Sequence, residues 1–157
     1  MTERVVLDSS VIVSALVQTD EFQPLARRIM QRVFDGDYSS VESAVVPVEV
    51  CGSISRRVGV KLASSVRRQL SRWEEVGAMR LVELTHKRKN DAAELAIELQ
   101  LRGMDAIILQ VAKENTCPLI TFDAQLAKAA RKVVEVLTQR ELTDRSEVKR
   151  AKTGGST

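Results

Sequence analysis

The 157-residue sequence predicts an α/β domain in which a parallel β-sheet lies between two layers of helices. Short segments rich in valine, isoleucine and leucine recur along the chain and stay apolar at successive positions, as strands buried on both faces of a sheet do. Helical patterns separate these segments, and helices are the usual right-handed connections between parallel strands. We therefore expect a single three-layer α/β/α sandwich over residues 1–140.

Five short segments are expected to form the strands of this sheet. Most consist of β-branched and aliphatic residues, as in Val5-Val6-Leu7 and Leu119-Ile120. They lack the alternation of apolar and polar residues that is typical of a strand with one wet face. The predicted strands are residues 4–7, 43–46, 79–84, 118–121 and 133–137.

Amphipathic helical patterns fill the intervals in the first half of the chain. A helix over 11–17 should follow the first strand, and Pro24 is well placed in the first turn of a second helix. Apolar residues recur at helical spacing in that second helix and again in a later basic segment. The two stripes are Leu25, Ile29 and Val33, and Leu62, Val66, Leu70 and Trp73.

Two further helices are expected before the fourth strand. Asn90 or Asp91 can cap a helix that runs to Leu101. Residues 106–112 are apolar nearly all round, Gln110 excepted, so this helix should be central and buried. Two helices therefore occupy several of the intervals between strands, which is more than a minimal crossover needs.

The distribution of apolar and charged residues predicts where the protein is located and where its folded domain ends. No apolar stretch approaches the roughly 18 residues that cross a bilayer, and the N-terminus does not read as a secretory signal, so we expect a cytoplasmic protein with no membrane association. Residues 141–157 turn polar and charged and are expected to form a flexible C-terminal tail.

The cysteine and histidine content argues against several enzyme classes. Cys51 and Cys117 lie far apart, match no metal-binding spacing, and are expected to be reduced thiols. The single histidine, His86, cannot by itself build a zinc site or a histidine-based catalytic triad. Zinc hydrolases and serine hydrolases are therefore disfavoured.

Basic residues are clustered, although the net charge is only +3. Such clusters suit a polyanion that lies across an acidic centre, but they also occur as solvated helix faces, and the sequence leaves both readings open. One cluster falls within residues 52–73 and the other precedes the helix ending at Leu101. The members are Arg56, Arg57, Lys61, Arg67, Arg68 and Arg72, and Lys87, Arg88 and Lys89.

Four acidic residues occupy the ends of apolar runs or the starts of helices: Asp8, Glu49, Asp105 and Asp123. Each alone has an ordinary explanation as a helix cap or as a favourable charge in a first helical turn. Together they are expected at one edge of the sheet, where the carboxyl ends of parallel strands meet. Crowded carboxylates repel one another unless a cation lies between them, and Mg²⁺ and Mn²⁺ prefer such oxygen ligands.

One hydroxyl group is placed to orient this acidic site. Thr121 lies two residues before Asp123 and projects to the same side if the strand geometry continues. The sequence therefore predicts a metal-dependent enzyme that acts on phosphates, with Thr121 able to orient a carboxylate or a metal-bound water.

With these residues in place, the chain resembles the PIN-domain ribonucleases, in particular stand-alone toxins of the VapC type. The resemblance covers about residues 4–137 and depends on the order and spacing of four short motifs. They are Val5-Val6-Leu7-Asp8-Ser9-Ser10, the lone Glu49, Asp105-Ala106-Ile107-Ile108-Leu109-Gln110-Val111-Ala112, and Thr121-Phe122-Asp123-Ala124-Gln125-Leu126.

The resemblance implies the fold, the chemistry and the partners. The metal-site acids of the family fall on Asp8, Glu49, Asp105 and Asp123, its hydroxyl near the fourth acid falls on Thr121, and its polar residue after the first acid falls on Ser10. Asp8 and Asp105 are then the best candidates for direct ligands, with Thr121 and Ser10 as orienting groups. The family implies a central five-stranded parallel sheet, Mg²⁺ or Mn²⁺ as cofactor, and endonucleolytic cleavage of RNA. It also implies a homodimer and a small antitoxin protein as partner. The basic segment 52–73 matches no partner site of the family by residue.

Other functions remain open to different degrees. A haloacid-dehalogenase-like phosphatase would need an acid where the chain has Ser10, and a receiver domain would need paired acids beside the first strand. A non-catalytic PIN-fold module that binds RNA or protein is the main alternative.

The stripe that ends at Trp73 could serve a dimer or antitoxin contact instead of the core. Aromatic residues make up only 3% of the chain, so no stacking platform for single-stranded bases is expected.

Overall fold

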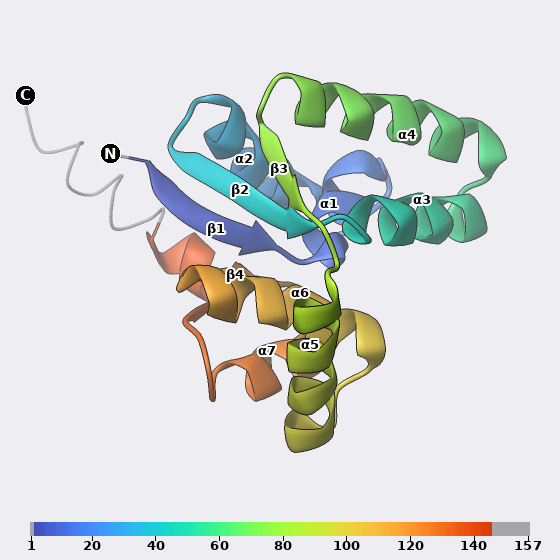
Figure 1. Ribbon diagram of the computed structural model, residues 1–157. Helices are drawn as coiled ribbons and strands as arrows, with labels where there is room; N and C mark the ends of the chain where they lie inside the picture. Colours follow the sequence, from blue (N-terminus) through green and yellow to red (C-terminus); the bar gives the residue numbers. More distant parts are fainter. Residues whose placement is uncertain (1, 146–157) are drawn as a thin grey trace, which may run out of the picture.

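The computed structural model describes residues 2–145 and contains a sheet of five short parallel strands with helices on both faces (Figure 1). The strands are β1 (Glu3–Leu7), β2 (Tyr38–Ser43), β3 (Met79–Val82), β4 (Leu119–Ile120) and β5 (Val136–Leu137). The helices are α1 (Ser9–Leu16), α2 (Gln23–Phe34), α3 (Val46–Arg57), α4 (Val60–Glu75), α5 (His86–Leu99), α6 (Gly103–Asn115) and α7 (Ala124–Ala130). The predicted three-layer α/β/α class with a five-stranded parallel sheet is confirmed.

Strand β1 lies at the centre of the sheet, whose order is β3-β2-β1-β4-β5. Its first half pairs with β2, from Glu3 opposite Tyr38 to Val5 opposite Ser40. Its second half pairs with β4, where Val6 and Leu7 lie opposite Leu119 and Ile120. The strands that lead to Asp8 and to Asp123 are therefore hydrogen-bonded neighbours.

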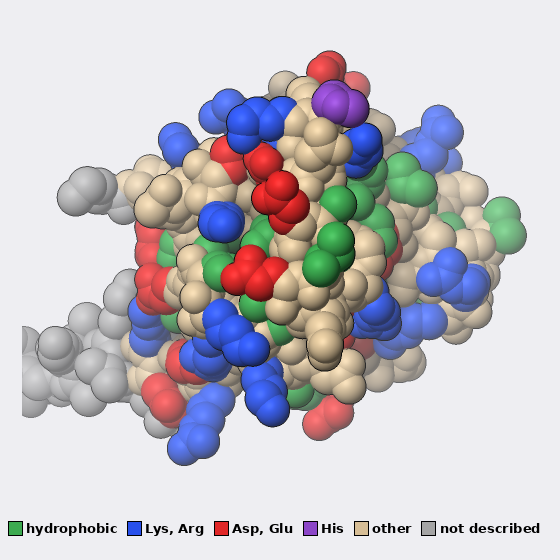
Figure 2. Space-filling view, turned by 60° about the horizontal axis from the view of Figure 1, so that its bottom comes forward, with side chains coloured by type: hydrophobic (Ala, Val, Ile, Leu, Met, Phe, Trp, Pro, Cys, Tyr) green, Lys and Arg blue, Asp and Glu red, His purple; other side chains and the backbone are tan. Residues whose placement is uncertain are grey.

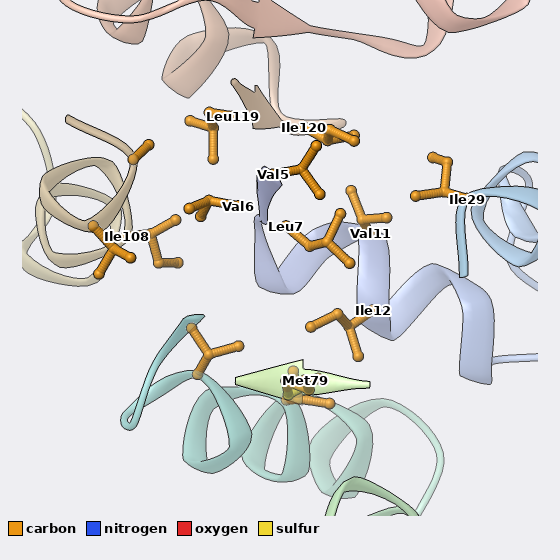
Figure 3. Close-up of a cluster of buried hydrophobic side chains, with 14 of the residues drawn as sticks. Val5, Val6, Leu7, Val11, Ile12, Ile29, Met79, Ile108, Leu119 and Ile120 are labelled. Atoms are coloured by element: carbon orange, nitrogen blue, oxygen red, sulfur yellow. The ribbon is translucent and has the colours of Figure 1, made fainter. Parts of the chain in front are cut away.

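The core forms because β1 is apolar on both faces, as a central parallel strand must be. Figure 3 shows Val6 directed toward Ile108 of α6, whereas Val5 and Leu7 face α1 and its Val11. All five side chains are fully buried or nearly so. The two helical layers therefore clamp β1 from opposite sides and hold its carboxyl end in a fixed position.

Each of the first three crossovers contains two helices, as the sequence predicts: α1 with α2, α3 with α4, and α5 with α6. Pro24 lies in the first turn of α2. In α4, Val66, Leu70 and Trp73 are buried in the core, and the Trp73 ring meets Phe34 edge-on at a centroid distance of 5.3 Å. Their burial favours the core role for this stripe over a partner surface.

The predicted second strand, residues 43–46, is wrong by several positions. Strand β2 is the polar segment Tyr38–Ser43, residues 44–45 form a turn, and α3 begins at Val46. The apolar run Ala44-Val45-Val46 resembles a buried strand, whereas the real strand buries polar side chains instead. Ser40, Glu42 and Ser43 are each at most 3% exposed. The hydrophobic pattern does not predict β2, because its buried side chains are polar. Hydrogen bonds offset the cost of removing them from water.

Glu42 replaces a missing backbone partner where β1 and β2 stop pairing. Its Oε1 accepts hydrogen bonds from the Leu7 N–H at 2.8 Å and from the Ser40 hydroxyl at 2.7 Å. Its Oε2 is buried and has no hydrogen-bond partner among residues 2–145. Burial raises the pKa of Glu42 well above its ordinary value, more than these two hydrogen bonds lower it.

One prediction about the helices of the second half needs correction. The cap of α5 is Thr85, whose hydroxyl accepts the Arg88 N–H at 3.2 Å, and neither Asn90 nor Asp91 lies at the start of the helix. Gln110, the polar exception in the apolar run of α6, is itself buried at 3% exposed. Helix α6 is thus central and buried, as predicted.

The described chain ends in a helical segment. Residues 139–145 are helical, and Leu142 is 7% exposed. The predicted flexible tail begins within this segment, and its remainder, residues 146–157, lies outside the described residues. Within residues 2–145, no helix combines the length and the apolar character that crossing a membrane requires.

Candidate active site

A pocket of about 340 Å³ lies at the carboxyl ends of β1 and β4, and all four predicted acids line it. Asp8 directly follows β1, and Asp123 follows β4 at the start of α7. Glu49 lies in the first turn of α3 and Asp105 in the first turn of α6. The fold thus brings together four carboxylates that are separated by up to 115 residues in the sequence.

Asp8 is the most buried acid of the pocket, at 4% exposed. Its Oδ2 accepts hydrogen bonds from the Ser10 hydroxyl at 2.6 Å and from the Thr121 hydroxyl at 2.8 Å. Although Asp8 occupies the cap position of α1, its side chain makes no capping hydrogen bond. Helix capping therefore does not account for this aspartate.

The pKa of Asp8 is raised from its ordinary value. Burial is the largest cause, and the carboxylates of Asp105 and Glu49 raise it further, against the lowering effect of the Ser10 and Thr121 hydroxyls. The three carboxylates are thus close enough to repel one another, and removal from water intensifies that repulsion. A cation placed among them would favour the charged form of Asp8.

Thr121 connects two acids through one hydroxyl group. It donates to Asp8, as above, and accepts the backbone N–H of Asp123 at 3.0 Å. Ser10 makes a parallel link, because its oxygen also accepts the backbone N–H of Phe122 at 3.3 Å. The two hydroxyls tie the end of β1 to the end of β4, and the predicted orienting positions of both agree with these contacts.

Glu49 is held by Ser9, to which the sequence assigned no role of its own. The Ser9 hydroxyl donates to Glu49 Oε2 at 2.5 Å and makes a longer contact with Asp8 Oδ1 at 3.5 Å. The neighbouring Val48 is 73% exposed, so this turn of α3 lies at the surface. Two adjacent serines after Asp8 were the available signal for a hydroxyl-lined site.

Arg102 lies between Asp105 and Asp123. Its guanidinium contacts Asp105 Oδ2 at 3.1 Å and Asp123 Oδ2 at 3.3 Å, while its own side chain is 75% exposed. The other oxygen of Asp123 caps α7 by accepting the N–H groups of Gln125 and Leu126. Asp123 therefore combines the capping role and the site role that the sequence presented as alternatives.

The pKa of Asp105 is also raised, chiefly by burial, with Arg102 lowering it and Asp123 raising it. Arg102 thus compensates the acidic charge only in part. Sequence reasoning missed this arginine because a single basic residue three positions before Asp105 has no distinctive pattern.

The donor set fits a hard divalent cation, although the cluster is not a complete cation site as it stands. Within residues 2–145, no three carboxylate, imidazole or thiol groups are arranged to hold a metal ion directly. Arg102 occupies one oxygen each of Asp105 and Asp123, so these oxygens become available only when its side chain moves away. Four carboxylates around one pocket are the oxygen ligands that Mg²⁺ and Mn²⁺ select.

The basic segment 52–73 divides between two surfaces. Arg56 and Arg57 at the end of α3 line the acidic pocket, whereas Arg67 of α4 lines another pocket together with Cys51. Arg57 is paired with Asp20 at 3.0 Å. Arg56 makes no ion pair with any group in the described part of the chain and is exposed.

The second basic cluster reads as a solvated helix face. Lys87 pairs with Asp91 at 2.7 Å, and Arg88 pairs with Glu114 at 2.9 Å. Figure 2 shows the same interspersed arrangement over one face of the molecule, where lysine and arginine side chains lie among acidic ones.

Two phenylalanines also line the acidic pocket, which the low aromatic content did not suggest. Phe22, between α1 and α2, and Phe122, between Thr121 and Asp123, meet at a centroid distance of 5.4 Å with their ring planes tilted by 52°. The sequence signal was present in the position of Phe122 beside two site residues.

Comparisons with known proteins agree with this architecture. The family model described as "PIN domain" matches residues 5–132. VapC20 of Mycobacterium tuberculosis, described as a Sarcin-Ricin loop cleaving toxin, superposes with a TM-score of 0.66 at 18% identity and covers 80% of this chain and 94% of its own.

Two structures of toxin–antitoxin assemblies are similar as well. VapBC2 from Rickettsia felis, bound to a promoter DNA fragment, gives a TM-score of 0.61 at 14% identity, covering 86% of this chain and 98% of its own. A toxin–antitoxin complex from Klebsiella pneumoniae gives 0.63 at 17% identity, covering 85% and 96%. At these identities the likeness shows the fold. No protein with a curated description matches the chain in sequence.

Proposed function

Because this chain belongs to the PIN-domain family, we propose that it is a metal-dependent endoribonuclease that hydrolyses phosphodiester bonds in RNA, and that it acts as a VapC-like toxin. The observation that carries the proposal is the convergence of Asp8, Glu49, Asp105 and Asp123 on one pocket, which is also lined by Arg56, an arginine with no ion pair to residues 2–145. An acidic centre beside a cationic side chain suits a polyanion whose reacting phosphate meets bound metal.

The residues take distinct roles in this proposal. Asp8, Glu49, Asp105 and Asp123 would hold Mg²⁺ or Mn²⁺, which when bound supplies positive charge to the reacting phosphate and polarises water. Thr121 fixes the Asp8 carboxylate by its hydrogen bond at 2.8 Å.

The serines and arginines of the pocket have the remaining roles in the proposed site. Ser10 fixes the same Asp8 oxygen, and Ser9 fixes Glu49. Arg56 and Arg57 would contact phosphates of the strand on either side of the cleaved bond. No histidine base is needed, which suits a chain with one histidine that lies outside this pocket.

The partners follow from the relatives. The Rickettsia felis and Klebsiella pneumoniae structures are toxin–antitoxin assemblies, so we propose a small antitoxin protein as partner. A homodimer is proposed with it.

The test is Asp8→Asn, with Asp91→Asn on α5 as a matched control at an exposed aspartate outside the pocket. We expect the wild-type chain and the control to cleave a single-stranded RNA in Mn²⁺ but not in EDTA, and Asp8→Asn to lose at least about a hundredfold in rate, the usual scale for removing one electrostatic group from a preorganised site. Full activity of a folded Asp8→Asn protein would refute the proposed site.

One observation supports a second candidate, a non-catalytic PIN-fold module that binds RNA or protein. Arg102 already pairs with both Asp105 and Asp123, so the negative charge of the cluster is partly compensated without metal. The same assay separates the two functions, because the module would bind RNA in Mn²⁺ and leave it intact.

A further inference from the structure

We propose that Phe22 and Phe122 form a subsite that stacks one unpaired nucleobase beside the acidic pocket. The inference rests on the proposed ribonuclease function and adds the two residues of this chain that would contact a base next to the cleaved bond.

The first argument is position. Phe122 stands between Thr121 and Asp123, and its backbone N–H donates to Ser10, which in turn holds Asp8. Its backbone is therefore anchored next to the acids, and its ring lines the pocket. Phe22, in the segment between α1 and α2, lines the same pocket and contacts the Phe122 ring.

The second argument is exposure. Both rings are only partly buried and both line the pocket. Phe122 also packs against the core, but Phe22 does not belong to the core cluster and its ring contact is with Phe122. An apolar ring that is left partly exposed in a pocket of charged groups offers a flat face to a ligand.

The third argument is how the aromatic residues are used. The chain has three phenylalanines, one tyrosine and one tryptophan. Phe34 packs on the buried Trp73, and the buried Tyr38 takes Arg32 over its ring at 4.0 Å. The two remaining aromatic residues are the pair at the acidic pocket.

The fourth argument is rigidity, because a stacking platform must hold its ring in place. Asp20 accepts the backbone N–H of Phe22 at 2.9 Å through one carboxylate oxygen and the Arg57 guanidinium at 3.0 Å through the other. Burial raises the pKa of Asp20, but hydrogen bonds from Phe22, Arg57 and Ser14 and the positive charge of Arg57 together lower it below its ordinary value. Arg57 of the pocket wall is thus tied to the segment that carries Phe22.

These features together select the substrate. A base within a duplex is already stacked on its neighbours and cannot reach a side-chain ring, whereas an unpaired base can leave its stack and lie on one. Arg56 lines the same pocket and makes no ion pair with residues 2–145, so it would contact a phosphate of the bound strand. The subsite therefore admits single-stranded RNA and discriminates against duplex.

The experiment measures binding apart from cleavage. All variants carry Asp8→Asn, so that binding is measured without cleavage. Phe22→Leu keeps an apolar side chain but removes the aromatic face, whereas Phe22→Tyr keeps an aromatic face at this position. Phe34→Leu is the matched control, since it removes an aromatic ring that lies outside the pocket. The probes are a fluorescent single-stranded RNA 12-mer, the same strand in a duplex, and a set of 12-mers with one abasic position moved along the strand.

The expected result is specific to stacking. One abasic position should weaken binding to the Asp8→Asn protein by about tenfold, the usual effect of losing one base–aromatic stack. Phe22→Leu should bind the intact strand about tenfold more weakly and show no preferred abasic position. Phe22→Tyr and Phe34→Leu should keep the profile of the parent, and all four should bind the duplex equally weakly.

The outcomes separate the two proposals. If Phe22→Leu keeps the affinity and the abasic profile of the parent, the stacking subsite is overturned and the nuclease proposal is untouched. If the Asp8→Asn protein still cleaves RNA, the nuclease site is overturned, while the abasic profile still decides on the subsite. Equal binding of single strand and duplex by the parent also overturns the subsite.

Discussion

The Arg102 guanidinium contacts two carboxylates that come from different elements, Asp105 of α6 and Asp123 after β4. It therefore competes with any cation that needs those oxygens. Because its side chain is largely exposed, the two contacts are screened and individually weak. Arg102 can leave the acids at little cost once a dication is present.

Replacing Arg102 by Gln should tighten Mn²⁺ binding about two- to fivefold, because the variant removes this competition without changing any carboxylate. Isothermal titration of Mn²⁺ into the metal-free protein measures the change. Arg88→Gln removes an arginine paired with Glu114 outside the pocket and should leave the affinity unchanged. Equal affinity of wild type and Arg102→Gln would show that Arg102 does not hold the site against metal.

Glu42 is a second residue whose charge is constrained by the fold. Its folded-state pKa lies well above the ordinary value of 4.5 because it is fully buried. The folded protein therefore keeps a proton that the unfolded chain releases, and stability falls as pH rises from about 4.5 toward the folded-state pKa. Each unit of that difference corresponds to about 1.4 kcal/mol.

Glu42→Gln removes this titration and keeps an acceptor for the Leu7 N–H and the Ser40 hydroxyl. We expect the variant to be more stable than wild type at pH 7, with the difference shrinking toward pH 4. Urea denaturation at a series of pH values measures it. A constant difference between the two proteins across this range would mean that Glu42 does not titrate in the folded protein within it.

At the scale of elements, the sequence predicted what depends on hydrophobic periodicity. Strand β1, helix α6 and the crossovers of paired helices follow from runs and stripes of aliphatic residues, and so the edge that gathers the four acids was predicted too. Strand β2 was not, because Ser40 and Glu42 are buried by hydrogen bonds that only the folded chain supplies. The same limit hid Ser9, Arg102 and Phe22, whose roles depend on partners distant in sequence.

The start of α5 provides a direct test of capping. Thr85→Ala should lower the free energy of unfolding by about 1 kcal/mol, since it removes the acceptor of the Arg88 N–H. Asn90→Ala should change stability little, because Asn90 lies inside the helix and caps nothing. Chemical denaturation of both variants measures the difference, and a larger loss for Asn90→Ala would move the cap to the position that the sequence suggested.

At the scale of the whole molecule, charge is distributed and not concentrated. The net charge is only +3, and many basic side chains outside the pocket are already paired, as Lys87 and Arg88 are. Affinity for RNA should therefore come from the few cations at the acidic pocket and not from a general attraction to polyanions.

The salt dependence of RNA binding tests this distribution. With Arg56 and Arg57 as phosphate contacts, the logarithm of the affinity should fall with the logarithm of salt concentration at a slope of about −1.4, from about −0.7 per contact. Arg56→Ala should make the slope shallower by about 0.7. Arg68→Ala, which removes an exposed arginine of α4 outside the pocket, should leave it unchanged. Equal slopes for the two variants would remove Arg56 from the binding surface.

Strand β1 divides its five residues between two neighbours, the first three to β2 and the last two to β4. The acids are therefore carried by two differently paired parts of the sheet. Glu49 lies on the helix that follows β2, Asp123 follows β4, and Asp8 follows β1, which pairs with both strands. A change that loosened only the short ladder between β1 and β4 would shift Asp123 away from Asp8 and leave Glu49 where it is. The spacing between Asp8 and Asp123 thus depends on two positions of backbone pairing between β1 and β4, together with the hydrogen bonds through which Thr121 links the two acids.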